Sequence, residues 1–293
     1  MPSLLNLLTL VAAGLVVGFS PAGAQDTIRF AVIGDYGWAG KPEADVARMV
    51  LSWNPDFIIT LGDNNYPKGE AKTIDANIGQ YYSSYIGNYR GAYGNGSPTN
   101  RFWPSLGNHD MMTDGGRPYL DYFTLPGNER YYDFVIGPIH FFVLNSDFRE
   151  PDGVKVDSKQ AQWLKEKMSV STTPWQVVYM HHPPYSSGDH GPTRYMQWPF
   201  SEWGADLVLA GHDHTYERLR VDGLIYIVNG LGGASRYKFK NPQTSSATKY
   251  NDDHGAMIVE ATAAAIRLRA YTRAGAIIDE YLLEKVAKAT PRR

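Results

Sequence analysis

The chain has 293 residues, of which 43% are hydrophobic and 13% aromatic, so it can fill a large hydrophobic core and shows no bias toward disordered or fibrous sequence. Its formal net charge of -2 gives no reason to expect a nucleic-acid-binding surface. The sequence contains no cysteine, which excludes disulfides, cysteine nucleophiles and thiolate-bound metal. Any metal ion must therefore be held by oxygen atoms and imidazole nitrogens.

The N-terminal segment has the pattern of an export signal. Residues 1–24 contain no charged side chain, run apolar from Leu4 to Phe19 and end in the small-x-small sequence Ala22-Gly23-Ala24. Because this segment has no Lys or Arg, an uncleaved membrane anchor is the alternative. We expect residues 1–24 to be a cleaved signal peptide. Residues 25–293 are then expected to form a single, monomeric catalytic domain, periplasmic or secreted and without stable membrane association.

The next part of the chain predicts a strand, a helix and a second strand. Residues 27–34 form an apolar run, as expected of a buried strand that is followed by a loop. Residues 43–53 carry apolar side chains at helical spacing, and residues 56–62 form another short apolar run. Short links between these elements predict a βαβ unit within a layered α/β fold.

The remaining elements are less regular. We expect a short helix and a long loop over residues 66–100, and a helix over residues 158–168 that is capped by Asp157. Apolar runs predict strands at 101–106, 131–136, 139–145, 175–180 and 205–210, and the last third predicts antiparallel strands at 215–221, 224–228, 256–261, 266–271 and 277–283.

Polar side chains follow five of the apolar runs, at the point where each run ends. Because ligands of α/β sheets bind beyond the carboxyl ends of strands, these side chains can meet at one edge of the fold. Any one of them is also consistent with an ordinary turn, but no structural need calls for the whole set. Six of the eight histidines belong to this set or lie near it. The set comprises Asp35, Asp63 with Tyr66, Asn108 with His109, His181 with His182, and His212 with His214, and His190 lies nearby.

These segments resemble the five signature blocks of the purple acid phosphatases, which belong to the calcineurin-like metallophosphoesterases. The segment that begins at His190, nine residues after His181, further resembles the small, tartrate-resistant branch of that family. The resemblance extends from about residue 27 to the C-terminal strands and implies two mixed β-sheets packed as a sandwich and flanked by helices. The segments are Gly34-Asp35-Tyr36-Gly37, Gly62-Asp63-Asn64-Asn65-Tyr66, Gly107-Asn108-His109-Asp110, Val178-Tyr179-Met180-His181, Gly211-His212-Asp213-His214 and His190-Gly191-Pro192-Thr193.

The resemblance implies a site for two metal ions that share the carboxylate of Asp63. The ligands of the first ion include three anionic oxygens, counting a phenolate, and suit Fe(III). Those of the second are the shared carboxylate and neutral donors, and they suit divalent Fe, Zn or Mn. The implied ligands are Asp35, Asp63, Tyr66 and His214 for the first ion, and Asp63, Asn108, His181 and His212 for the second.

The implied activity is the hydrolysis of phosphate monoesters, with small phosphorylated molecules as substrates. Two adjacent metal ions can generate a bridging hydroxide that attacks phosphorus, so no protein nucleophile is needed. His109 and His190 are not among the implied ligands and are candidates for stabilising the phosphoryl oxygens and protonating the leaving group. We expect Asp110 to orient His109. We expect His182 to point away from the site, because side chains alternate along a strand.

Two alternatives stay open. A phosphodiesterase, or a hydrolase of nucleotides or anhydrides, would use the same site. Phosphodiesterases of this superfamily commonly carry a histidine two residues after the first aspartate, where this chain has Gly37, and lack the equivalent of Tyr66. A non-catalytic metal- or phosphate-binding protein on the same scaffold is the other alternative. Such a protein would lack a metal ligand or both of the spare histidines, His109 and His190. This sequence retains all of these residues.

Overall fold

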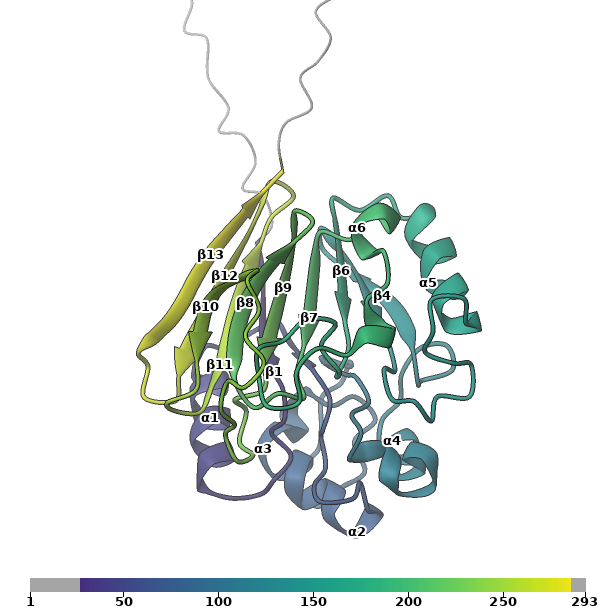
Figure 1. Cartoon of the computed structure of the whole chain (residues 1–293). Coiled ribbons are helices and arrows are strands. Elements are labelled where there is room, and N and C mark those ends of the chain that lie inside the picture. Colours follow the sequence, from purple (N-terminus) through teal and green to yellow (C-terminus); the bar gives the residue numbers. More distant parts are fainter. Residues whose placement is uncertain (1–26, 286–293) are drawn as a thin grey trace, which may run out of the picture.

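The computed structural model describes residues 27–285, in which two mixed β-sheets pack against each other with helices around them (Figure 1). This arrangement confirms the predicted fold class. The predicted export signal and its cleavage site lie outside the described residues. Within residues 27–285, no helix is long and apolar enough to cross a membrane.

The first sheet has six strands, and β1 (Ile28–Ile33) lies near its centre. β1 pairs in parallel with β2 (Phe57–Thr60) and antiparallel with β11 (Gly255–Ala261). Helix α1 (Lys41–Ser52) connects β1 with β2, which confirms the predicted βαβ unit. The strand order is β13-β12-β11-β1-β2-β3, where β3 is Phe102–Pro104, β12 is Ala265–Thr272 and β13 is Ile277–Glu284.

The second sheet has seven strands in the order β10-β8-β9-β7-β6-β5-β4. Its middle is parallel, since β5 pairs with β6, β6 with β7, and β7 with β9 in that sense. Both edges are antiparallel. The strands are β4 (Tyr132–Ile136), β5 (Ile139–Val143), β6 (Trp175–Tyr179), β7 (Leu207–Ala210), β8 (Tyr216–Val221), β9 (Leu224–Asn229) and β10 (Ser246–Tyr250).

Aromatic side chains fill the space between the two sheets. Phe30 of β1 stacks on Phe57 of β2 with ring centroids 5.0 Å apart, and its ring meets the edge of Phe141 from β5 at 5.3 Å. A second hydrophobic cluster joins the seven-stranded sheet to α5 (Lys159–Ser169) and α6 (Phe200–Trp203). Each fully buried side chain of this kind contributes about 1.5–3 kcal/mol to the hydrophobic free energy of folding.

Short helices lie below the strands in Figure 1, where the chain leaves β2 and β3. They are α2 (Ala71–Ile74), α3 (Gln80–Tyr82) and α4 (Arg117–Tyr122), with further helical turns at Asp75–Gly79 and Ser83–Tyr85. Residues 71–85 are therefore helical over more of their length than the single short helix that the sequence predicts. The long loop that follows them is confirmed.

Several elements differ from the sequence prediction. α5 is capped by Ser158 rather than Asp157, because Oγ of Ser158 accepts a hydrogen bond from the backbone N–H of Ala161. The sequence does not predict α4, α6 or β10, and β10 is a half-exposed edge strand without a continuous apolar run. The C-terminal strands divide between the two sheets, and β9 pairs antiparallel with β8, as predicted, but also parallel with β7 on its other side.

Gly62 lies where the end of β2 in one sheet approaches the end of β6 in the other. Its φ is 84°, in the left-handed region that favours glycine. A Cβ atom at residue 62 would lie 2.6 Å from Nδ1 and 2.7 Å from Cγ of His181, closer than non-bonded atoms approach. The missing side chain therefore allows the ends of the two sheets to meet.

We expect Gly62→Ala to destabilise the metal-free protein by roughly 2–4 kcal/mol, because it adds an overpacked contact with His181 to the strain of a left-handed alanine. Gly223→Ala is a matched control. Gly223, in the turn between β8 and β9, also has a φ of 84° but has no atom within 4 Å of the position of an added Cβ. Denaturant unfolding should show a loss of only about 1 kcal/mol for the control. Equal losses in the two variants would mean that the contact with His181 imposes no constraint.

Candidate metal centre

Four buried side chains from both sheets converge where the strand ends meet. Asp35 follows β1, Asp63 follows β2 and His214 follows β7, and one ligand atom from each lies within 4.8 Å of the other two. The hydroxyl oxygen of Tyr66 lies 3.3 Å from Oδ1 of Asp35 and 3.1 Å from Nε2 of His214. The structure thus brings together the four residues that the sequence predicts for the first ion.

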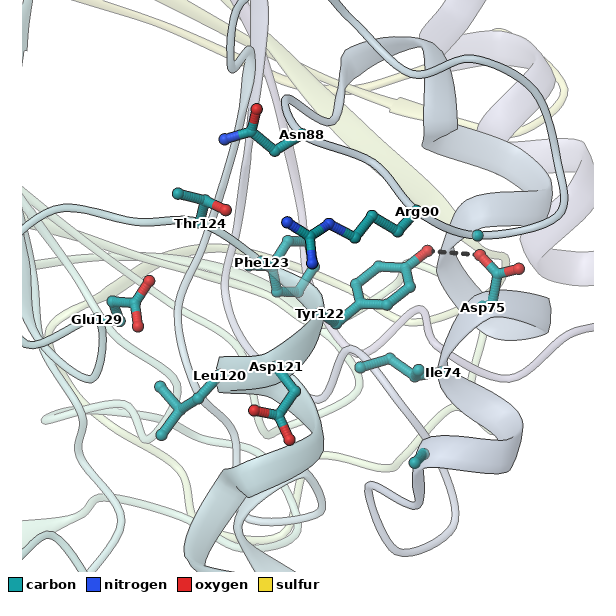
Figure 2. Close-up of a pocket in the computed structure, with 12 residues that line it drawn as sticks. Ile74, Asp75, Asn88, Arg90, Leu120, Asp121, Tyr122, Phe123, Thr124 and Glu129 are labelled. Carbon is teal, nitrogen blue, oxygen red and sulfur yellow. Dashed lines mark hydrogen bonds between the residues drawn. The ribbon is translucent and has the colours of Figure 1, made fainter.

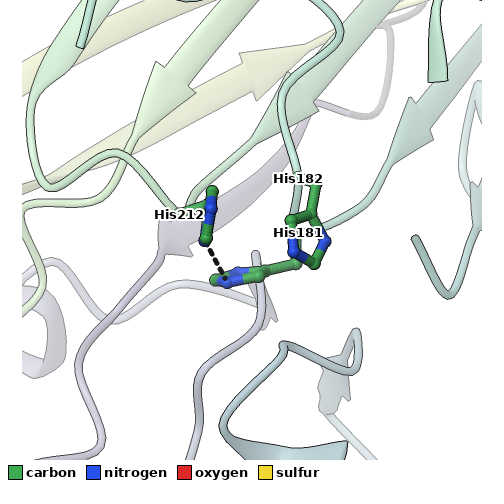
Figure 3. A group of neighbouring side chains, drawn as sticks. All are labelled: His181, His182 and His212. Atoms are coloured by element: carbon green, nitrogen blue, oxygen red, sulfur yellow. Dashed lines mark hydrogen bonds between the residues drawn. The ribbon is translucent and has the colours of Figure 1, made fainter. Parts of the chain in front are cut away.

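The residues predicted for the second ion surround Nε2 of His181. This nitrogen lies 3.4 Å from Oδ2 of Asp63, 3.0 Å from Oδ1 of Asn108 and 3.2 Å from Nδ1 of His212. Figure 3 shows the close approach of the His181 and His212 rings. Because Asp63 adjoins both groups of side chains, its carboxylate has the position that a shared ligand requires.

The backbone is strained at three of these residues. Asp35, Asp63 and His212 have φ angles of 54°, 51° and 68°, in the left-handed region that non-glycine residues seldom adopt. Such a conformation costs about 1–2 kcal/mol per residue and is found where the surrounding structure enforces it, often at functional sites. Here it bends the chain sharply after a strand.

Backbone donors hold the two carboxylates in place. The backbone N–H of His212 donates to Oδ2 of Asp35 at 2.8 Å, and that of His109 donates to Oδ1 of Asp63 at 2.9 Å. Each carboxylate is therefore fixed by a turn that follows a different strand. This arrangement orients the second oxygen of each carboxylate toward the neighbouring imidazoles.

Backbone carbonyls determine which imidazole nitrogen faces the site. Nδ1 of His181 lies 2.8 Å from the carbonyl oxygen of Leu61, and Nδ1 of His214 bonds to that of Ser235. Because a carbonyl only accepts, Nδ1 carries the hydrogen of the neutral ring and Nε2 keeps a lone pair for a metal ion.

The electrostatics of the site favour bound positive charge. Asp35 and Asp63 are almost completely buried, and buried carboxylates are unfavourable unless they are paired. Burial lowers the pKa of an imidazole, yet the carboxylates of Asp63 and Asp35 raise the pKa of His181 to about 10. Burial raises the pKa of Asp63, but His181 and His109 hold it below the usual range. In the metal-free protein, protonated imidazole thus balances the negative charge of the carboxylates, which bound metal ions would otherwise balance. The oxygen and imidazole donors of the site fit such ions.

The two spare histidines lie beside these groups. The ring of His109 packs against that of Tyr66 with centroids 4.5 Å apart, and its Nε2 is 3.9 Å from Oδ2 of Asp63. The ring of His190 stacks on that of His212 at 4.2 Å. Each histidine is therefore near enough to reach a molecule bound at the strand ends.

The predicted partner of Asp110 is wrong. Its carboxylate accepts hydrogen bonds from the backbone and side-chain nitrogens of Asn64 and from the backbone N–H of Gly107. The ring of His109 is held instead by the carbonyl oxygen of Pro67, 2.6 Å from Nδ1. Asp110 thus joins the turn after β2 to the turn after β3.

The predicted orientation of His182 is also wrong. Its ring centroid is 4.4 Å from that of His212, and one of its nitrogens lies within 4.8 Å of ligand atoms of both His181 and His212 (Figure 3). Alternation fails because β6 ends at Tyr179, so His181 and His182 belong to a turn. Burial and the neighbouring His181 lower the pKa of His182 to about 3.

Sequence reasoning missed a sixth polar strand end, which follows β5. Oγ of Ser146 lies 2.9 Å from Nδ1 of His182. Arg149 donates from Nη2 to the backbone oxygen of Asn108 at 2.8 Å and from Nε to Asp147 at 2.7 Å. The signal was present, since the apolar run 139–144 is followed by Asn-Ser-Asp as the other runs are followed by their polar residues.

One cavity lies away from these side chains. It has a volume of about 480 Å³ and lies between residues 71–75, the loop around Arg90 and α4 (Figure 2). The carboxylate of Asp75 at its edge accepts hydrogen bonds from the hydroxyls of Tyr89 and Tyr122, at 2.6 and 2.8 Å. The carboxylate of Asp75 is thus already paired with donors. A second cavity, of about 410 Å³, is lined by Trp38 and Ser235 and adjoins the strand ends.

Comparisons with known proteins agree with the geometry. Residues 28–216 match the family model described as calcineurin-like phosphoesterase. Human tartrate-resistant acid phosphatase type 5 is 26% identical over 263 residues, covering 76% of this chain and 78% of that protein. A purple acid phosphatase from yellow lupin seeds has a similar structure, with a TM-score of 0.72, 18% identity, and coverage of 91% of this chain and 55% of that one.

GAP50, described as the anchor in the inner membrane complex of Plasmodium, has a TM-score of 0.71 at 18% identity and covers 90% of both chains. At such identities the structural likeness shows the shared fold alone. The family model covers more than half of the chain and includes every predicted metal ligand. The protein belongs to the calcineurin-like phosphoesterase family.

Proposed function

We propose that the protein hydrolyses phosphate monoesters of small molecules with the help of two metal ions. The observation that supports this most strongly is the position of the Asp63 carboxylate, which adjoins two groups of oxygen and imidazole donors. Similarity to human tartrate-resistant acid phosphatase type 5 supports the same activity.

The donor atoms suggest which ions are bound. In this proposal the first group holds Fe(III), because hard anionic oxygens suit a trivalent ion, and the second group holds divalent Fe, Zn or Mn. When bound, two such ions supply a hydroxide nucleophile near neutral pH and positive charge for the phosphate oxygens. The first group is Asp35, Asp63, Tyr66 and His214, and the second is Asp63, Asn108, His181 and His212.

His109 and His190 act on the substrate in this proposal. The carbonyl oxygen of Pro67 accepts a hydrogen bond from Nδ1 of His109, so Nε2, on the side of Asp63, is the nitrogen that can take up and release a second proton. The backbone N–H of His190 donates to Oδ1 of Asp213 at 2.8 Å, which fixes the loop that carries the ring. Each imidazole can hold a proton for a phosphoryl oxygen or for the leaving-group oxygen.

The environment of Gly37 argues against the phosphodiesterase alternative. A Cβ atom at residue 37 would lie only 1.9 Å from the backbone oxygen of Asn64. The position at which related phosphodiesterases commonly carry a histidine therefore has no room for a side chain. A non-catalytic binding protein on the same scaffold is the second candidate, since GAP50, which has a similar fold, is described as an anchor. Retention of every implied ligand and of both His109 and His190 favours the enzyme.

Asp63→Ala tests the shared ligand. We expect this variant to lose bound metal and activity toward p-nitrophenyl phosphate together, because both groups of donors lose an anionic oxygen. Elemental analysis and turnover would be measured on the same sample. Asp121→Ala is the control, since this exposed carboxylate of α4 pairs with Arg117 on the same helix and its loss should leave both quantities unchanged. Retained activity in Asp63→Ala would rule out the shared ligand.

Tyr66→Phe tests the ferric site. If the phenolate binds Fe(III), the purified protein has a visible charge-transfer band, and the variant lacks it. Absorbance spectra of protein with known iron content check this expectation. A wild-type enzyme that is colourless, free of iron and fully active would refute the role of Tyr66.

His190→Ala tests the proton donor. We expect turnover to fall by roughly 100-fold or more, the usual contribution of a general acid, while the metal content stays the same. His140→Ala is the control, because this ring bonds to Asp133 and Ser171, away from the strand ends. The proton-donor role is eliminated if His190→Ala turns over as fast as the control.

A further inference from the structure

His182 is a buried imidazole at the strand ends that neither proposed metal ion uses. It follows His181 in the chain, and its ring lies beside that of His212 (Figure 3). One of its nitrogens is within 4.8 Å of the ligand atoms of both neighbours. Its chemical role depends on which ring nitrogen carries the hydrogen.

Ser146 determines the tautomer of His182. Oγ of Ser146 accepts a hydrogen bond from the backbone N–H of His182 at 2.8 Å, and the same oxygen lies 2.9 Å from Nδ1. The hydroxyl has one hydrogen, and among the described residues Nδ1 is the other hydrogen-bonding partner of Oγ and can accept this hydrogen. Donation to Nδ1 leaves the hydrogen of the neutral ring on Nε2. The opposite tautomer would leave the hydrogen of a buried hydroxyl unpaired, at a cost of about 1–3 kcal/mol.

This arrangement is the reverse of that found at the proposed ligands. At His181 and His214 a backbone carbonyl accepts from Nδ1, so Nε2 presents a lone pair. At His182 a hydroxyl donates to Nδ1, so Nε2 presents a hydrogen. A lone pair suits a metal ion, whereas an N–H suits an anionic oxygen.

The surroundings of Ser146 keep this donor in place. The hydroxyl of Tyr195 donates to the backbone oxygen of Ser146 at 3.1 Å. The neighbouring carboxylate of Asp147 is paired with Nε and Nη2 of Arg149, both at 2.7 Å, so that its negative charge is balanced. An anionic substrate near His182 therefore meets an oriented N–H group and a compensated carboxylate.

We propose that His182 is a third catalytic imidazole, whose Nε2–H donates to a phosphoryl oxygen of the substrate, and that Ser146 is the positioning residue that fixes this tautomer. The inference rests on the proposed function, because it takes a phosphate group as the ligand. An oriented donor of this kind typically changes turnover by about 100- to 1,000-fold. No step in this role transfers the Nε2 hydrogen.

Two variants of His182 test the donor. The side-chain amide of His182→Gln can place an N–H near the position of Nε2, whereas His182→Ala cannot. We expect His182→Ala to lower kcat by roughly 100-fold and to weaken the binding of inorganic phosphate about 10-fold at unchanged metal content, and His182→Gln to restore much of both. Phosphate binding would be measured by calorimetry on metal-loaded protein, and metal content by elemental analysis.

Ser146→Ala tests the positioning role separately. Nitrogen-15 NMR of the zinc-loaded wild type should show that Nδ1 of His182 is unprotonated and that Nε2 carries the hydrogen. In Ser146→Ala this preference should weaken, and kcat should fall by roughly 10-fold, less than in His182→Ala. A purely structural role of Ser146 would not change the tautomer.

Unchanged kcat and phosphate affinity in His182→Ala would overturn the proposal, as would the loss of a metal ion, which would mark His182 as a ligand. Wild-type NMR spectra with the hydrogen on Nδ1 would also overturn it. A different result would contradict the proposed function, namely that the metal-loaded wild type hydrolyses no phosphate monoester. In that case the donor role is still decided by the phosphate affinities and the NMR spectra.

Discussion

The burial of two carboxylates where the sheets meet is the constraint on which the rest of the site depends. Asp35 and Asp63 lie close together and are almost entirely excluded from water. Two such charges are tolerated only when positive charge and hydrogen-bond donors surround them. The raised pKa of His181 and the backbone donors of His109 and His212 are responses to this constraint. Bound metal ions would compensate the two carboxylates in the same way, with more positive charge than a protonated imidazole carries.

The fold supplies the geometry that the carboxylates require. Each sheet contains a run of neighbouring parallel strands, so several strand ends lie along one edge, and the close packing at Gly62 brings the two edges together. Left-handed turns at Asp35, Asp63 and His212 are strained, and that strain is maintained by packing in the rest of the fold. Loss of packing near these turns should therefore affect the site before it affects the distant core.

The sequence predicts much of the site because the relevant signal is local. An apolar run followed by a polar residue marks a strand end, and parallel pairing brings such ends together without any knowledge of contacts. The end of β5 escapes this reasoning because Asn, Ser and Asp are also the usual residues of turns. β10 is not predicted because an edge strand that is half exposed needs no apolar run.

Contacts between distant segments are harder to predict. The partner of Asp110 is Asn64, 46 residues earlier in the chain, and the sequence around Asp110 does not indicate it. The orientation of His182 depends on where β6 ends, and strand ends are among the least certain features of a sequence pattern. Residues that carry charge at strand ends are thus predictable, whereas the residues that orient them depend on tertiary structure.

The number of metal ions bound by the native protein tests the central claim most directly. Elemental analysis of the protein purified without chelators, with its concentration measured independently, gives this number. A shared carboxylate between two groups of donors predicts two ions per chain. A single ion per chain after saturation with iron and zinc would contradict this account, as would no bound ion.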